Sequence, residues 1–179
     1  MLEREKTLLV VVDVQERLLP AMSDPERVLD RAARAARGCA VLGVPALVTE
    51  QVPSALGRTV EALREALDLY EPIEKDSFSC CGERAFTEAV DRIDPADVLL
   101  CGIESHVCVL QTARALIQSC RRVHVLSDAV DSRDPENRAV ALRRMERDGA
   151  IPSSVEIALF EMLKGASAPE FRSIVKIVK

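Results

Sequence analysis

The feature that most constrains the fold is the alternation of short apolar runs with longer amphipathic stretches along the whole chain. The first run, Thr-Leu-Leu-Val-Val-Val before Asp13, is typical of a parallel strand buried on both faces. The predicted strands are residues 7–13, 45–50, 72–75, 97–102 and 122–128. The predicted helices are residues 24–42, 59–67, 83–93, 106–120, 135–148, 155–163 and 169–178. This order predicts an α/β fold with a mostly parallel sheet and helices on both faces.

The helical stretches carry start and stop signals. The stretch 24–42 has Ser23 or Asp24 as its N-cap, Pro25 in its first turn and Gly43 after its end. No long linker, internal repeat or low-complexity segment interrupts the 179 residues, and 48% of them are hydrophobic. We therefore predict one globular domain that spans residues 1–179.

The charge balance narrows the classes of partner. The formal net charge is −5, whereas nucleic acids and anionic membranes attract surfaces with clustered cations. The first apolar run is too short for a signal peptide or a membrane span. We therefore expect a cytoplasmic protein that binds a small molecule, with no nucleic-acid or membrane partner.

Six cysteines are present, yet their pattern does not indicate disulfides or zinc. A chain of this length needs no covalent staples, no C-x-x-C pair occurs, and His106 and His124 lie far apart in sequence. Most of the thiols are expected to be small buried hydrophobes. The sequence thus predicts no metal and no cofactor.

Polar residues at strand ends are the candidate site, because ligands of open parallel sheets bind beyond the carboxyl ends of the strands. Asp13 ends the first strand, where it acts either as a turn cap or as a general base. Lys75 ends the third and is either a surface lysine or a cation within the site. Cys108 follows the fourth strand in the predicted first turn of a helix, where free N–H groups favour a thiolate and can bind an oxyanion. The alternative for Cys108 is a buried core cysteine.

No histidine is placed to activate this thiol. His106 is two residues from Cys108 and projects in another direction on a helix, and His124 lies inside a predicted strand. Asp13 is the alternative base if Lys75 balances the two anions.

These residues together resemble a known family, the isochorismatase-like cysteine hydrolases. The resemblance rests on Asp13-Val14-Gln15, on Lys75, and on the pattern G-I-x-x-x-x-C-V-x-x-T-A from Gly102 to Ala113. The segments LVTEQ (47–51), CGIE (101–104) and SDAVDSRDPENRAVALRRMERDG (127–149) are most similar to the subgroup of isochorismatase domain-containing proteins. The resemblance implies a Rossmann-like three-layer α/β/α sandwich.

The resemblance also implies roles for single residues. Asp13, Lys75 and Cys108 form a catalytic triad in which the cysteine attacks an electrophilic carbon, as in an amide or ureide, and forms a thioester. A cis peptide joins Ile103 to Glu104, and the N–H groups of Glu104 and Cys108 form the oxyanion hole. The expected substrate pocket includes Gln15, Glu50, Gln51 and Phe78. Metal-binding members of the family carry histidines after the second strand, and this chain has none there.

Two other functions use the same residues. An activated Cys108 also suits a thiol protein that senses oxidants or electrophiles. A closed pocket, narrowed by Glu104, would instead indicate a pseudoenzyme. Members of the family commonly assemble, so we expect a homo-oligomer, a dimer or higher. Its apolar face is expected in the C-terminal region, at Phe160, Met162, Leu163, Phe171, Ile174 and Ile177.

Overall fold

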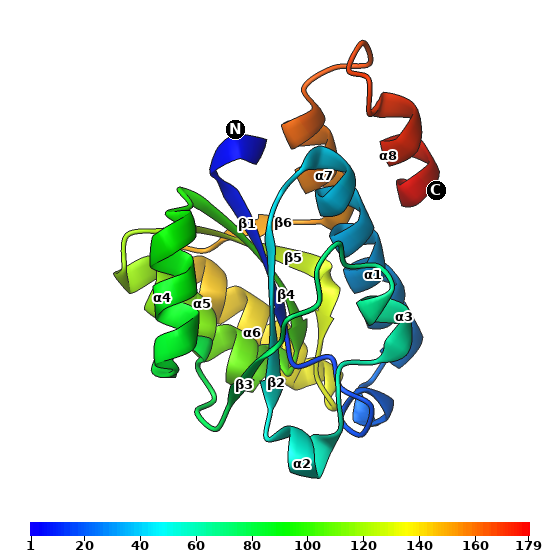
Figure 1. The fold of residues 1–179 in the computed structure, drawn as a ribbon. Coiled ribbons are helices and arrows are strands. Elements are labelled where there is room, and N and C mark those ends of the chain that lie inside the picture. Colours follow the sequence, from blue (N-terminus) through cyan, green and yellow to red (C-terminus); the bar gives the residue numbers. More distant parts are fainter.

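One sheet of six parallel strands forms the centre of the molecule, and the computed structural model describes all residues from 1 to 179. The order across the sheet is β3-β2-β1-β4-β5-β6 (Figure 1). The strands are β1 (Thr7–Val12), β2 (Ala46–Gln51), β3 (Ile73–Lys75), β4 (Asp97–Ile103), β5 (Arg122–Asp131) and β6 (Ile151–Ser153). All residues of β1 and β4 are buried, as expected for the central strands of a parallel sheet.

Helices cover both faces of the sheet and complete three layers (Figure 1). On one face lie α1 (Pro25–Leu42), α3 (Glu61–Arg64), α7 (Val155–Leu163) and α8 (Phe171–Val178), over a core cluster of 28 residues. On the other lie α4 (Arg84–Ile93), α5 (Leu110–Gln118) and α6 (Pro135–Arg147), over a cluster of 19 residues. The short α2 (Pro53–Leu56) follows β2. The predicted α/β/α sandwich is confirmed.

Several boundaries differ from the sequence-based prediction. The stretch 59–67 is helical only in α3, because Thr59 is extended and forms a bridge with Gln15. The strand β6 was not predicted; it has three residues and is defined by its pairing with β5. The helix expected from residue 106 instead begins with a wide π-helical turn, Ser105–Val109, before α5.

The apolar C-terminal residues are used within the chain. Met162, Leu163 and Ile174 are buried in the core beneath α1, α7 and α8. Phe160, Phe171 and Ile177 pack against the same cluster. The expectation that these residues form an open oligomer face is therefore wrong, because the chain covers them itself. No helix is long and apolar enough to cross a bilayer.

The topology places the strand ends that matter at one edge. From β1 the chain moves outward to β2 and β3, then returns to β4 on the other side of β1. The direction of winding thus switches between β1 and β4, and this switch point is where open α/β sheets bind ligands. Asp13 follows β1, Lys75 ends β3, and the turn with Cys108 follows β4.

Candidate active site

A close approach of the two central strands positions Asp13. Gly102 has φ +120°, and a Cβ there would lie 2.1 Å from the carbonyl oxygen of Val12, so only glycine fits. The next residue along the first strand, Asp13, has φ +54° in the left-handed region. A non-glycine residue rarely adopts this conformation, and such strain clusters at functional sites.

Asp13 is fully buried and bound differently at its two oxygens. Its Oδ1 accepts a hydrogen bond from Thr49 Oγ1 at 2.8 Å. Its Oδ2 lies 2.7 Å from Lys75 Nζ in an ion pair whose side chains are both buried. Burial raises the pKa of the Asp13 carboxyl, and the charge of Lys75 and the hydroxyl of Thr49 limit that rise. The carboxylate is thus a stronger base than an exposed one.

Lys75 is enclosed by oxygen atoms. Its Nζ donates to Gln51 Oε1 at 2.5 Å and to the carbonyl oxygens of Ser77 and Phe78 at 3.2 and 3.3 Å. Burial lowers the pKa of Lys75, but the neighbouring Asp13 carboxylate raises it more, so the net shift is upward. The amine is therefore a fixed cation, and its proton is not available for catalysis at neutral pH.

Cys108 lies in the π-helical turn and is 6% exposed. Burial raises the pKa of its thiol to about 12, and the charge of Asp13 raises it while Lys75 lowers it. Burial and the Asp13 charge thus act against the thiolate that the sequence predicts at the start of a helix. The thiol keeps its proton until a base takes it.

The turn that carries Cys108 is anchored to the end of β5. The peptide bond between Ile103 and Glu104 is cis. The Glu104 carbonyl accepts from the N–H groups of Val107 and Val109 at 3.1 and 3.2 Å, and Ser105 Oγ donates to the Asp131 carbonyl at 2.8 Å. These bonds fix the backbone on both sides of the cysteine.

The Glu104 side chain has a partner of its own. Its carboxylate accepts from Arg133 Nε at 2.9 Å and from the Arg133 backbone N–H at 3.2 Å. Glu104 is 9% exposed at its side chain, whereas Arg133 is 64% exposed and reaches solvent. The pairing offsets the negative charge that the sequence placed four residues before Cys108.

Four other residues were predicted to line the pocket: Gln15, Glu50, Gln51 and Phe78. Gln15 donates to the carbonyls of Gln51 and Gly57 and accepts from the Gln51 N–H, so its amide braces the strand end. The Glu50 carboxylate binds Thr59, Tyr70 and Arg58. The polar atoms of Gln15 and Glu50 are thus bonded within the protein and are not free for a ligand. The Gln51 side chain binds Lys75. The Phe78 ring is 55% exposed.

Two further residues, Thr49 and Cys80, lie next to the buried pair. The Cys80 Sγ lies 3.6 Å from Thr49 Oγ1, and its backbone N–H donates to Thr112 Oγ1 at 2.9 Å. Burial raises the pKa of the Cys80 thiol to about 11, and the charge of Asp13 adds to that rise. The position of Thr49 at a strand end was a signal, but Cys80 lies outside any strand and gave none.

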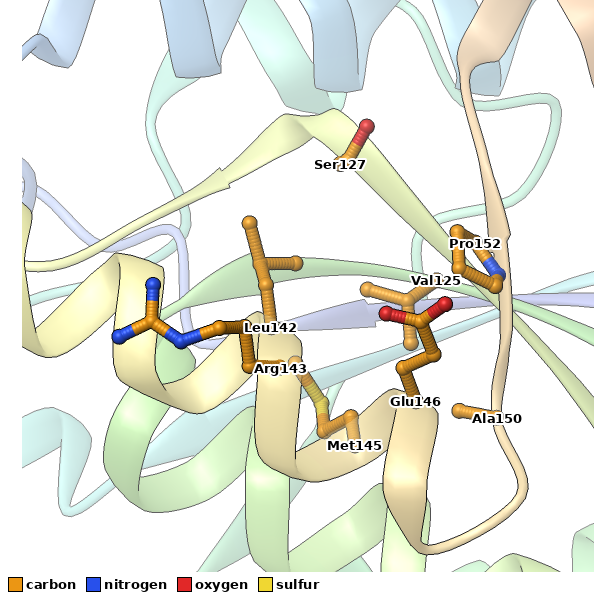
Figure 2. A pocket seen from close by; sticks show the side chains of 8 residues that line it. All are labelled: Val125, Ser127, Leu142, Arg143, Met145, Glu146, Ala150 and Pro152. Carbon is orange, nitrogen blue, oxygen red and sulfur yellow. The ribbon is translucent and has the colours of Figure 1, made fainter.

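One surface groove includes a residue of the site, and another cavity lies away from it. A groove of about 320 Å³ reaches Lys75 and is otherwise bordered by residues 52–54, Glu74, Asp76 and Glu83. Another cavity of about 200 Å³ lies between α6 and the strands β5 and β6, and includes no residue of the site (Figure 2). No group of three or more His, Cys, Asp or Glu side chains could hold a metal ion.

Comparison with known proteins identifies the family. The isochorismatase domain family matches residues 7–157. Isochorismatase domain-containing protein 2A of Mus musculus is 37% identical over 176 residues, 98% of this chain and 84% of that protein. The solved structure of MAR1 ribonuclease from Caenorhabditis elegans has a TM-score of 0.94 at 33% identity, covering 99% of this chain and 91% of that one.

A more distant structure shares the fold. The YcaC gene product of Escherichia coli, an octameric hydrolase of unknown specificity, has a TM-score of 0.87 at 19% identity, covering 98% of this chain and 94% of that one. The family match and the relatives in the 30–40% range cover nearly all of the sheet and the site. The chain therefore belongs to the isochorismatase family, in the subgroup of isochorismatase domain-containing proteins, and has that family's hydrolase fold.

Proposed function

We propose that the protein hydrolyses a small amide, ureide or related metabolite, with Asp13, Lys75 and Cys108 as its catalytic triad. The observation that carries the proposal is the buried Asp13–Lys75 pair, 2.7 Å apart, whose charges both act on the Cys108 thiol. A buried base with a raised pKa beside a thiol that keeps its proton is the arrangement that nucleophilic catalysis requires.

The first step is proton transfer coupled to attack. Asp13 Oδ2 takes the Cys108 proton, and Sγ forms a bond to the carbonyl carbon while the carbonyl π electrons move to oxygen. The negative charge thus passes from carboxylate to sulfur and then to the substrate oxygen, around the fixed Lys75 cation. The N–H groups of Glu104 and Cys108 are proposed to stabilise the oxyanion.

The second step expels the amine. The protonated Asp13 gives its proton to the leaving nitrogen as the carbon–nitrogen bond breaks, which leaves a thioester on Cys108. Water then attacks the thioester, Asp13 accepts its proton, and the acid product leaves as the thiol re-forms. No redox change or cofactor enters this sequence.

The charges of the groove favour neutral or cationic substrates. Glu74, Asp76 and Glu83 border this groove beside Lys75, and Arg133 is paired with Glu104. A polyanion such as RNA would meet these carboxylates, so the name of the Caenorhabditis elegans relative is not carried over to this chain. We also propose a homo-oligomer in the cytoplasm. The octameric YcaC product supports the assembly, and six free cysteines fit a reducing compartment.

The test is a mass-spectrometric search for an acyl adduct on Cys108 after exposure to a panel of small amides and ureides. We expect an adduct in the wild type and in Cys39→Ala, a control that removes another buried thiol. Cys108→Ala should form no adduct and turn over none of the panel members that the wild type hydrolyses. Turnover by Cys108→Ala would overturn the proposal.

The same experiment separates the alternative functions. A sensing thiol would give adducts with electrophiles and peroxide but none with amides, and a pseudoenzyme would give neither. The raised pKa of Cys108 argues against a sensing thiol, since such cysteines rest as thiolates.

A further inference from the structure

The hydroxyl of Thr49 donates a hydrogen bond to the base. Thr49 lies in β2, is fully buried, and its Oγ1 is 2.8 Å from Asp13 Oδ1. An ionised carboxylate only accepts hydrogen bonds, so the single proton of the Thr49 hydroxyl must point at Asp13. The direction of this bond is therefore fixed by chemistry.

A second contact orients the same hydroxyl. Cys80 Sγ lies 3.6 Å from Thr49 Oγ1, and the raised pKa of Cys80 keeps that thiol protonated. Because the Thr49 proton is engaged with Asp13, the Cys80 S–H is the donor in this contact. The chain Cys80–Thr49–Asp13 thus ends on Oδ1, whereas Oδ2 lies 2.7 Å from Lys75 Nζ.

We propose that Thr49 is a positioning residue for the triad, and that its hydroxyl holds Oδ1 so that Oδ2 alone exchanges a proton with Cys108. This inference rests on the proposed function. Thr49 touches neither sulfur nor substrate in this role; it sets which oxygen of Asp13 reacts and lowers the pKa of that carboxyl. Cys80 supports the same geometry without reacting.

The test is the pH dependence of Cys108 alkylation by iodoacetamide, followed by mass spectrometry. Alkylation consumes the Cys108 thiolate, which forms when Asp13 takes the thiol proton. The alkylation rate therefore falls as the pH drops through the pKa of Asp13, because a protonated Asp13 can no longer accept that proton. Loss of one hydrogen bond to a charged group raises the pKa of that carboxyl. Thr49→Val should move this acid limb to higher pH by about one unit.

Matched variants separate this effect from general damage. Thr49→Ser keeps the hydroxyl and should restore the wild-type limb. Thr59→Val removes an equivalent buried bond of 2.8 Å, to Glu50, and should leave the limb in place. If Thr49→Val does not fold, Thr49→Ala takes its place, with thermal unfolding as the check on each variant.

The outcomes for the two proposals differ. If the wild type shows an acid limb that neither Thr49→Val nor Thr49→Ala moves, the positioning role of Thr49 is overturned. The proposed catalytic triad is then unaffected. A shift shared by Thr59→Val would overturn the positioning role as well. A wild-type protein whose Cys108 shows no acid limb would instead overturn the proposed function itself.

Discussion

Two buried aspartates lie at opposite ends of the sheet and differ in what surrounds their oxygens. Asp97 begins β4, where its carboxylate accepts from Arg122 at 2.7 and 2.5 Å and from His124 at 2.9 Å. Burial alone would raise the pKa of Asp97, but these bonds lower it below its usual value. Asp13, which follows β1, has a raised pKa, and its oxygens contact one hydroxyl, that of Thr49, and one cation, that of Lys75.

The contrast shows how one residue type serves two ends of a fold. At Asp97 every oxygen has donors, so the carboxylate is held ionised and stabilises the start of two strands. At Asp13 one oxygen pairs with the Lys75 amine at 2.7 Å, and the cost of burying the carboxylate is offset by this cation rather than by more donors. This is the oxygen that we propose for proton exchange.

The largest expected effect is on turnover. Asp13→Asn should lower the turnover of any amide identified by the adduct screen roughly a thousandfold, because general acid–base catalysis typically contributes 10²–10⁴-fold. Asp97→Asn is the matched control and should stay within a few fold of the wild type. Steady-state kinetics on both variants measures this, and equal losses would show that the two aspartates do not differ in role.

Asp13→Asn should at the same time make the Cys108 thiol more acidic. The charge of Asp13 raises the thiol pKa and Lys75 lowers it, so removing the carboxylate leaves only the cation. We expect a thiol pKa below the wild-type value of about 12, read from the alkylation rate against pH. A more reactive thiol with less turnover would show that Asp13 acts as the proton carrier. An unchanged thiol pKa would contradict the effect of the Asp13 charge on Cys108.

The cations at the two ends should differ in their effect on stability. Lys75→Met leaves the Asp13 charge buried without a partner, which typically costs about 3–5 kcal/mol of unfolding free energy. Arg122 is 60% exposed, so Arg122→Met should cost much less, since water replaces it. Urea unfolding at neutral pH measures both. The double variant Asp13→Asn/Lys75→Met should recover most of the loss, and failure to recover would place the cost outside the ion pair.

The two carboxylates should also give stability opposite pH dependences. The folded pKa of Asp97 is lowered, so its contribution is present above the unfolded pKa of about 3.9 and lost as the pH falls through the folded value. The folded pKa of Asp13 is raised, so stability falls as the pH rises from about 3.9 through that value.

Unfolding between about pH 2.5 and pH 7 tests these signs. Asp97→Asn should remove part of the loss of stability at low pH, and Asp13→Asn should remove part of the fall above pH 3.9. The test compares slopes against pH and not absolute stabilities, because Asp13→Asn leaves the buried Lys75 cation without its partner. Curves for both variants that run parallel to the wild type across the range would contradict both pKa shifts.

The sequence predicted the end of the molecule that carries chemistry better than the contacts within it. The β-α alternation and the strand-end positions of Asp13, Lys75 and Cys108 were sufficient to place them at one edge, because parallel strands end together. The sequence did not show that burial and the Asp13 charge raise the pKa of Cys108, since both depend on packing. Gln15 and Glu50 were predicted to line the pocket, and only the structure shows that their polar atoms already have partners within the protein.

The smallest expected effect is that of the Arg133 charge at the outer rim of the site. Arg122, at the other end of the sheet, is the matched control. Arg133 offsets the carboxylate of Glu104 beside the Cys108 turn. Arg133→Met should leave stability nearly unchanged, because the arginine is 64% exposed. It should nevertheless make the surroundings of Cys108 more negative. The rate of alkylation by anionic iodoacetate should then fall by a few fold relative to neutral iodoacetamide, and the difference should shrink at high salt.

Arg122→Met, at the distant end of the sheet, should leave the ratio of the iodoacetate and iodoacetamide rates as in the wild type. If both variants changed the ratio alike, net charge and not the Arg133–Glu104 pair would govern access to Cys108.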